Sequence, residues 1–290
     1  MTGIEGARVQ HAAVVIPAKD EAARIEATVQ AAFSIPRVDL VVVVDDGSTD
    51  ATAAIAQGAG ALVVRHRVNQ GKAAAMATGA RLIAMRENAD RADGSGDNTE
   101  HIEEPVPGHT GELPVVLEDG EDAPVLARPI LFIDGDMQDS AANAAPLIDA
   151  VLDDGVDMAI ATLPPQEGAA GMGLVVRTAR NGIERATGFV AEQPLSGTRC
   201  ITRETWDAVQ PLAPGWGVET GLTIDALDKG FWVKEIPAEL SHRATGRDMR
   251  SQLHRAAQLR DVMRALRSRR HLSPNDPLEE PVGDQADETD

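Results

Sequence analysis

The sequence has little cysteine and few aromatic residues, which excludes several classes of protein. Among 290 residues there is one cysteine, Cys200, so the chain has no internal disulfide framework and too few thiols for a cysteine-based zinc site. Aromatic residues make up 2% of the chain and tyrosine is absent. A nucleic-acid surface usually combines basic stripes with stacking aromatic side chains, so we expect no nucleic-acid partner.

Long apolar runs are also missing. No run approaches the roughly 20 apolar residues needed to cross a bilayer. The first residues, MTGIEGARVQHAAVV, lack the basic and then apolar pattern of a signal peptide. Because 43% of the residues are hydrophobic, a globular core is expected. We therefore expect a cytoplasmic globular protein.

The net charge of −19 is concentrated in two segments. Residues 87–122 carry twelve acids and one base, and residues 272–290 carry seven acids and no base, which leaves the rest of the chain near −1. Both segments are rich in Gly, Pro, Ser, Asn and Asp, a composition typical of disorder. We predict a single domain over residues 12–271, with a disordered acidic insertion at about 88–126 and a disordered acidic tail at 272–290.

Strand and helix patterns alternate along the first half of the chain. We predict strands at 14–17, 40–44, 61–65 and 130–134, with helices at 21–33, after DDGSTD, and at 71–86. The second half predicts strands at 158–161, 198–202 and 231–236, and helices at 175–187, 204–209, 218–229 and 248–270. The fold class is α/β, with a mostly parallel sheet flanked by helices, and ligands are expected at the carboxyl ends of its strands.

Two acidic residues, Asp45 and Asp46, end the strongest predicted strand. A carboxylate at this position can accept hydrogen bonds from a ribose hydroxyl or a base N–H, so we expect at least one of them to contact a nucleotide. Ser48 is a further expected nucleotide-sugar contact, although Ser48 or Thr49 could instead cap the next helix. The earlier motif PAKDE ends the first strand beside this turn, and there Asp20 has the residue type of a helix N-cap.

Lys72 stands at the start of a predicted helix, a position that ordinarily favours negative charge. An anion such as a diphosphate, bound between the lysine and the helix N-terminus, would reconcile the two. The alternative is an ordinary surface lysine.

The stretch ILFIDGDMQDS places Asp134 and Asp136 one glycine apart at the end of an apolar strand. Two such carboxylates can hold a hard divalent cation, magnesium or manganese, whose other ligands are water and substrate phosphates. The alternative is that both side chains only make hydrogen bonds within the turn.

Taken in order, five segments resemble family 2-like glycosyltransferases with the GT-A fold: PAKDE, VDDGSTD, GKAAAM, DGD and GWGVETGLTIDALDKGFWVKEIPAELSHRATGRD. The resemblance covers residues 12–86 and 129–265. It implies that Pro17, Ala18, Glu21 and Asp45 contact the nucleoside. It also implies that the DGD pair holds the metal and the donor's diphosphate.

The second half is most similar to glucosyl-3-phosphoglycerate synthases, in LSGTRCITRE, GWGVETGL and the SHR segment, while polyprenyl-phosphate sugar synthases share the first half and part of the second. This resemblance implies that His242 is a third metal ligand and that Glu219 lies near the donor sugar and the acceptor. Glu219 is then a candidate general base for an inverting reaction, with retention left open. Arg177 and Arg180 could bind an anionic acceptor or form a solvated helix face.

We therefore expect a metal-dependent glycosyltransferase that moves a sugar from a UDP- or GDP-sugar to a phosphate-bearing acceptor, either 3-phosphoglycerate-like or a polyprenyl phosphate. The segment ATLPPQEGAAGMG lacks the aromatic and basic residues expected of a phosphoglycerate-specific enzyme, so the acceptor stays open. The arginine-rich last helix leaves peripheral membrane contact open, and a homodimer is also open.

Two other functions are compatible with these motifs. A nucleotidyltransferase shares the nucleotide-binding architecture and the metal carboxylates, but it usually has a Gly-rich basic loop after the first strand, where this chain has PAKDEAARI. A non-enzymatic nucleotide-binding or interaction module would use the acidic segments to recruit a basic partner.

Overall fold

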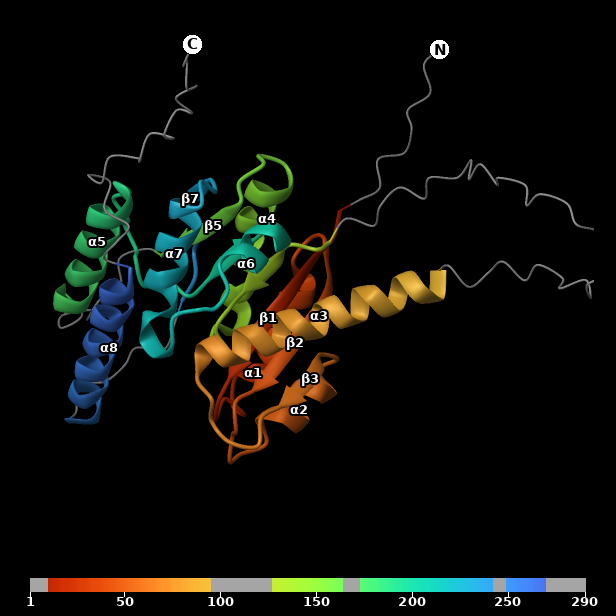
Figure 1. Ribbon diagram of the computed structural model, residues 1–290. Helices are drawn as coiled ribbons and strands as arrows, with labels where there is room; N and C mark the ends of the chain where they lie inside the picture. Colours follow the sequence, from red (N-terminus) through yellow and green to blue (C-terminus); the bar gives the residue numbers. More distant parts are fainter. Residues whose placement is uncertain (1–9, 95–126, 164–172, 242–248, 270–290) are drawn as a thin grey trace, which may run out of the picture.

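A 7-stranded sheet organises the molecule (Figure 1). The computed structural model describes residues 10–94, 127–163, 173–241 and 249–269. The strand order is β3-β2-β1-β4-β6-β5-β7, and every neighbouring pair is parallel except those formed by β6. The predicted α/β class with a mostly parallel sheet is confirmed. The strands are β1 (Ala12–Ala18), β2 (Val38–Asp45), β3 (Leu62–Arg65), β4 (Ile130–Phe132), β5 (Met158–Thr162), β6 (Arg199–Ile201) and β7 (Val233–Pro237).

Helices cover both faces of the sheet and explain its apolar strands. Val41 and Val43 of β2 pack into one core cluster, whereas Val42 and Val44 pack into the other. Both faces are therefore buried, which is why the strand is a continuous run of valines. The first cluster includes α1 (Ile25–Ser34), α2 (Thr52–Gly58), the 3-10 helix η1 (Gln138–Ala144) and α4 (Ala145–Leu152). The second includes α3 (Lys72–Gly94), α6 (Arg203–Ala208) and α7 (Val218–Asp228).

Two further helices form an outer layer beyond α7, as Figure 1 shows. α5 (Gly173–Thr187) and α8 (Met249–Ser268) pack on each other through Val175, Ala179 and Val262. Ile183 of α5 packs on Ile224 of α7. A short 3-10 helix, η2 (Gly215–Gly217), lies between this layer and the start of α7. None of the described helices is both long and apolar enough to cross a membrane.

The predicted elements are present, but the structure adds short helices and moves some bounds. η1 and α4 were not predicted, because the short apolar stretch PLIDAVL between acidic residues does not show a clear helical period. α3 continues to Gly94, so residues 88–94 are helical where the acidic insertion was expected to begin. Ala89, Arg91 and Ala92 in that stretch favour helix although its overall composition resembles a linker. Residues 95–126 and the tail lie outside the described residues, so their disorder stays a prediction.

The chain on both sides of residues 95–126 lies at the amino ends of the parallel strands. Glu87, near the end of α3, is buried and accepts a hydrogen bond from the backbone N–H of Arg128 at 3.0 Å. The Arg128 side chain makes two hydrogen bonds to Asp39 near the start of β2, at 2.8 and 2.7 Å. Arg203 also contacts Glu87, at 3.3 Å. These contacts hold both flanks of the insertion at the edge opposite the carboxyl ends of the parallel strands.

Candidate active site

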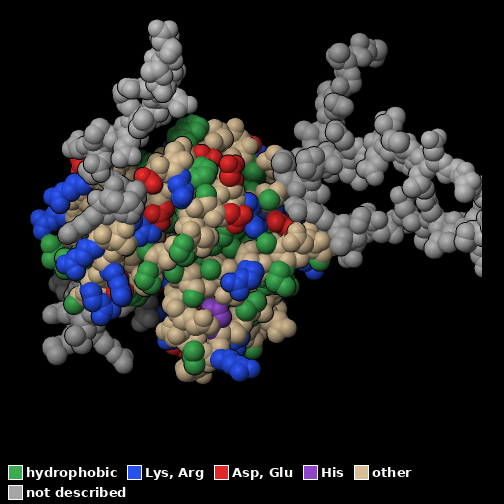
Figure 2. Space-filling model, in the orientation of Figure 1, with side chains coloured by type: hydrophobic (Ala, Val, Ile, Leu, Met, Phe, Trp, Pro, Cys, Tyr) green, Lys and Arg blue, Asp and Glu red, His purple; other side chains and the backbone are tan. Residues whose placement is uncertain are grey.

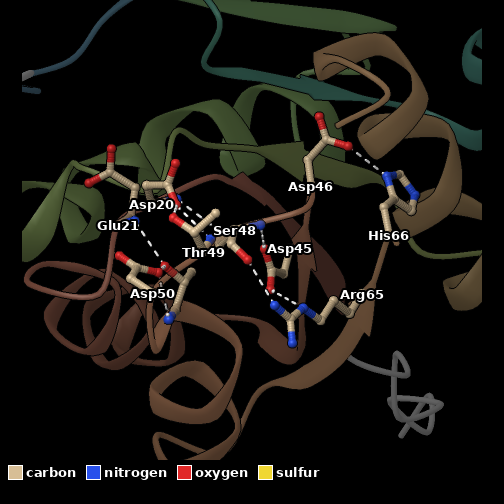
Figure 3. Close-up of polar contacts among 10 residues, drawn as sticks. Asp20, Glu21, Asp45, Asp46, Ser48, Thr49, Asp50, Arg65 and His66 are labelled. Atoms are coloured by element: carbon tan, nitrogen blue, oxygen red, sulfur yellow. Dashed lines mark hydrogen bonds and ion pairs between the residues drawn. The ribbon is translucent and has the colours of Figure 1, made fainter. Parts of the chain in front are cut away.

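The loops that follow β1 and β2 are joined by hydrogen bonds, shown in Figure 3. The Asp20 backbone N–H donates to Ser48 Oγ at 2.9 Å. In return, Asp20 Oδ1 accepts from the Thr49 N–H at 2.8 Å and from the Thr49 hydroxyl at 3.1 Å. Asp20 has a φ of +55°, a left-handed conformation that aspartate tolerates better than most residues. The expected N-cap role of Asp20 is wrong, because α1 begins later, at Ile25.

A second pair of contacts completes this loop network, which we define as Asp20, Glu21, Ser48, Thr49, Asp50 and Thr52. The Glu21 N–H donates to Thr52 Oγ1 at 2.9 Å, and Asp50 Oδ2 accepts from the Ala22 N–H at 3.1 Å. The Glu21 carboxylate forms an ion pair with Arg24 at 2.7 Å. Ser48 and Thr49 do not cap α2, whose N-cap residue is Ala51 without a side-chain cap. The network brings the predicted nucleoside residues of both loops to one place.

Asp45, the last residue of β2, is fully buried. Its Oδ1 accepts from the Ser48 N–H at 2.8 Å. Its Oδ2 lies 3.1 Å from Arg65 Nε, but the contact lacks hydrogen-bond geometry, and among the described residues Oδ2 has no hydrogen-bond partner. A buried acceptor without a donor is costly unless a ligand supplies one. Pro17 and Ala18 pair with Val44 and Asp45 in the sheet, so they lie at the same edge.

Asp46 points away from Asp45 and contacts His66, a residue that sequence analysis missed (Figure 3). The distance from His66 Nδ1 to Asp46 Oδ1 is 2.7 Å. The same carboxylate accepts from the Gln70 and Gly71 N–H groups, each at 2.8 Å. Burial raises the pKa of Asp46, but the hydrogen bonds from Gln70, His66 and Gly71 outweigh it and hold the pKa below its ordinary value.

Lys72, Asp134 and Glu219 meet at the same edge, and we call these three residues the Lys72 cluster. Lys72 Nζ lies 2.7 Å from Asp134 Oδ1 and 3.1 Å from Glu219 Oε1. Burial lowers the pKa of Lys72, but the two carboxylates raise it more, so the pKa lies above its ordinary value and the amine is protonated at neutral pH. The residues come from the start of α3, the turn after β4 and the first turn of α7.

Gly197 forms one wall of the cluster and was not predicted. A Cβ at this position would overlap the Lys72 ammonium and lie 3.1 Å from Asp134 Oδ2. The residue therefore gives the lysine room to reach both carboxylates. Since its backbone does not have a positive φ, no sequence signal distinguishes it from an ordinary loop glycine.

Behind this wall, Arg199 of β6 braces α7. It is 1% exposed, and its Nε and Nη1 donate to the Ser196 carbonyl and Thr223 Oγ1, both at 2.8 Å. Thr223 Oγ1 donates to the Glu219 carbonyl at 2.9 Å. Burial lowers the pKa of Arg199 to about 10, opposed by the charges of Glu219 and Glu235. Arg199 was missed because a lone arginine in a three-residue strand has no periodic pattern.

The turn that carries Asp134 and Asp136 is fixed on both sides. Thr28 of α1 donates to the Gly135 carbonyl at 3.0 Å, and a Cβ on Gly135 would lie 3.2 Å from Ala18 Cβ. Both carboxylates are partly exposed. Within the described ranges no group of three His, Cys, Asp or Glu side chains could hold a metal, and His242 falls outside those ranges. Two oxygen donors fit magnesium or manganese when diphosphate and water supply the remaining ligands.

The predicted acceptor residues lie on α5, in the outer layer. Arg180 donates to the Ala191 and Glu192 carbonyls at 2.7 and 2.6 Å, which joins α5 to the loop that follows it. Arg177 is exposed, and its Nε donates to the Gly173 carbonyl at 3.2 Å. Acceptor binding by these two residues stays a prediction.

Known proteins share this architecture. Residues 13–84 match the family model "Glycosyl transferase family 2". Glycosyltransferase AglJ from Haloferax volcanii is 26% identical over 212 residues, which are 72% of this chain and 56% of AglJ, so the chain spans about half the length of that relative.

Two solved structures of glucosyl-3-phosphoglycerate synthase from Mycobacterium tuberculosis are also similar. One, in complex with Mn²⁺, UDP and glucosyl-3-phosphoglycerate, has a TM-score of 0.64 and 25% identity, with 92% of this chain and 82% of that chain covered. The other, with Mg²⁺ and UDP, has the same score and identity and covers 92% and 81%. These findings confirm the predicted resemblance to family 2-like glycosyltransferases and the GT-A type of fold.

Proposed function

We propose that this protein transfers a sugar from a nucleotide-diphosphate sugar to an acceptor that carries a phosphate, with a divalent metal bound at the DGD turn. The observation that carries the proposal is the Lys72 cluster, which joins a protonated amine to Asp134 and Glu219 beside the loop network. The similar mycobacterial synthase was crystallised with UDP, a divalent metal and a glucosylated phosphoglycerate, which supports the same classes of ligand for this chain.

The nucleoside would bind over Asp45. Asp45 Oδ2 is a buried acceptor that lies in an ion pair with Arg65 but accepts no hydrogen bond from the described residues, and it suits an N–H donor of a base. Pro17 and Ala18 lie beside it at the end of β1, and Glu21 is positioned by the loop network. Because the network fixes these loops by backbone hydrogen bonds, the nucleoside site would be formed before the donor arrives.

Asp134 and Asp136 would hold the metal, with His242 as the predicted third ligand. When bound there, the metal supplies Lewis-acid neutralisation of the charge that develops on the leaving nucleoside diphosphate. Lys72 adds a second positive charge at this place. Its ammonium has three donor hydrogens, and the two carboxylates engage two of them, which leaves the third for a diphosphate oxygen.

Glu219 would act on the acceptor side. The residue is 7% exposed, its carboxylate is held by Lys72, and Arg199 and Thr223 fix the helix turn behind it. In this position the carboxylate can accept hydrogen bonds from a sugar hydroxyl. A phosphate acceptor is already ionised and needs no base, whereas a hydroxyl acceptor would need Glu219 as general base.

The outer helices favour an acceptor presented at a membrane surface. Figure 2 shows Lys and Arg side chains gathered over α5 and α8. The exposed residues of these helices include Arg177, Arg185, Arg260, Arg264 and Arg267, with Leu174 and Met263 among them. Exposed Trp216 lies in η2, three residues before Glu219. Exposed basic side chains with exposed apolar side chains in the same two helices suit an anionic bilayer, so we propose a lipid-linked phosphate as acceptor.

Calorimetric titration of nucleotide sugars into the purified protein tests the reaction class. We expect UDP-glucose, GDP-mannose or another donor to bind tightly only with Mn²⁺ or Mg²⁺. The bound donor is then offered 3-phosphoglycerate in solution and polyprenyl phosphate in vesicles, and transfer to the second would support the membrane-presented acceptor. Failure of every nucleotide sugar to bind the folded protein would contradict the proposal.

The nucleotidyltransferase alternative is tested by titrating nucleoside triphosphates in the same way. That enzyme would bind a nucleoside triphosphate and release pyrophosphate when offered a sugar phosphate. The loop after β1 argues against it, because Asp20 closes this loop onto Ser48 and Thr49 and no Gly-rich basic segment is present there.

A further inference from the structure

Two side chains that the proposed reaction does not use, Asp46 and His66, meet in a buried contact at the site edge. Asp46 directly follows β2, and His66 directly follows the adjacent parallel strand β3. The backbone N–H of His66 donates to the Asp45 carbonyl at 2.9 Å, which continues the hydrogen bonding between these two strands. Their side chains are 2.7 Å apart, and the residues are 6% and 8% exposed. A buried charged or polar pair of this kind needs a structural or functional reason.

The Asp46 carboxylate holds the loop that leads into α3. Its Oδ1 accepts from the Gln70 N–H and its Oδ2 from the Gly71 N–H, each at 2.8 Å. Gly71 has a φ of +91° and directly precedes Lys72, the first residue of α3. The carboxylate thus serves this helix as an N-cap side chain would, but it comes from a different strand.

His66 attaches the same carboxylate to the helix itself. Its Nε2 lies 3.0 Å from the Thr78 hydroxyl, in the second turn of α3. Because a carboxylate only accepts hydrogen bonds, Nδ1 of His66 donates to Asp46, and Nε2 shares a hydrogen bond with the Thr78 hydroxyl. The start of α3 is therefore fixed to the ends of β2 and β3 at two points.

We propose that Asp46 and His66 are positioning residues for Lys72. They hold Gln70, Gly71 and Thr78 so that the ammonium of Lys72 reaches Asp134 and Glu219, and Asp46 does not itself contact the nucleotide. The kinetic consequence rests on the proposed function, but the placement of Lys72 does not. The two parts can therefore be tested separately.

Acylation of the lysines by acetic anhydride, followed residue by residue with mass spectrometry, tests the placement without any substrate. Asp46→Asn should release Lys72 from Asp134 and Glu219 and expose its amine, so acylation of Lys72 should be several-fold faster than in the wild type. Exposed Lys229 serves as internal reference. Thr78→Val, which removes one hydroxyl and keeps the shape, should give a smaller increase. Unchanged Lys72 rates in both folded variants would overturn the proposal.

Glu87→Gln is the matched control. Glu87 is a buried carboxylate that holds the opposite end of α3 through Arg128 and Arg203. Its substitution, like Asp46→Asn, should lower the unfolding temperature, but it should leave the acylation of Lys72 unchanged. An equal acceleration in Glu87→Gln would show that general loosening of α3, and not the Asp46 contacts, controls Lys72, and this would also overturn the proposal.

A double-mutant cycle tests the kinetic consequence once a donor is known. Asp46→Asn should lower kcat by up to roughly 100-fold, the scale expected when a reacting group is misplaced. In a Lys72→Met background it should have almost no further effect, since both residues act through one ammonium. A persistent loss of donor affinity in that background would mean direct nucleotide contact by Asp46 and would overturn the proposal. If no donor binds any variant or the wild type, the proposed function fails while acylation still decides the placement.

Discussion

The loop network and the Lys72 cluster lie at the same edge of the sheet but are built from different bonds. The network consists mainly of backbone N–H groups that donate to side-chain oxygens, as in the contacts of Asp20 and Asp50. The cluster consists of side-chain ion pairs, and its three residues come from segments far apart in the sequence.

The loop network therefore acts as a scaffold, whereas the Lys72 cluster can rearrange when a ligand binds. Backbone hydrogen bonds in the network fix loop shape and cannot be exchanged without unfolding the loop. The partly exposed ion pairs of Lys72 contribute less to stability, and a bound anion or cation can replace them. Changes in the network should therefore reduce stability, and changes in or beside the cluster should reduce activity.

The largest effect is expected from Asp136→Asn. Loss of one metal carboxylate should lower kcat by roughly 1,000-fold or more, since Lewis-acid stabilisation of the leaving group amounts to several kcal/mol. The fold should persist, as judged by circular dichroism and unfolding temperature. The control Asp153→Asn removes an exposed acid that pairs with Arg37 and should keep activity. Turnover near the wild-type value in Asp136→Asn would remove the metal assignment.

Gly197→Ala should give the next largest loss. The added methyl group would displace the tip of Lys72, which is flexible and can move, so activity should fall by roughly 10- to 100-fold with little change in the unfolding temperature. Gly58→Ala is the control, because nothing lies within 4 Å of a Cβ there. A large drop in unfolding temperature for Gly197→Ala, without a specific loss of kcat, would contradict the distinction between cluster and network.

Asp20→Ala tests the expected effect of the loop network on stability. It removes the acceptor of two hydrogen bonds and places alanine in a left-handed conformation, so the free energy of unfolding should fall by roughly 1–3 kcal/mol. Asp20→Asn keeps an acceptor and tolerates the conformation, so it should lose less. Urea unfolding measures both. Equal stability of the alanine variant and the wild type would mean that these contacts do not hold the two loops.

The smallest effect is expected from replacing residues 95–126 with a short Gly-Ser linker. The helical residues 88–94 should be kept. They carry the chain roughly 10 Å beyond Glu87, so the linker must be long enough to return over at least that distance. The residues on both sides of this segment are held at the amino ends of the parallel strands, whereas the site lies at their carboxyl ends. Metal-dependent donor binding should therefore be nearly unchanged. A loss of donor binding would connect the acidic segment to the site and favour an interaction role for it.

Much of the site edge could be predicted from local sequence. A continuous run of valines ending in Asp45 indicates a buried strand with carboxylates at its end, and the motif order places Asp134 at the same edge. Asp20 and His66 could not be assigned in this way, because the partners of their side chains are set by the packing of adjacent loops. The helix of residues 145–152 was missed since its apolar stretch is too short to show a period.

The sequence by itself determined the parallel α/β sheet, because periodic apolar residues and turn chemistry are local properties that specify strands, helices and their order. It also determined which acids end those strands. Only the tertiary structure decided which charges pair, since ion pairs depend on distances across the fold. The contact of Lys72 with both Asp134 and Glu219, the room that Gly197 leaves for it, and the hold of Asp46 on the start of α3 all arise from segments that meet only in three dimensions.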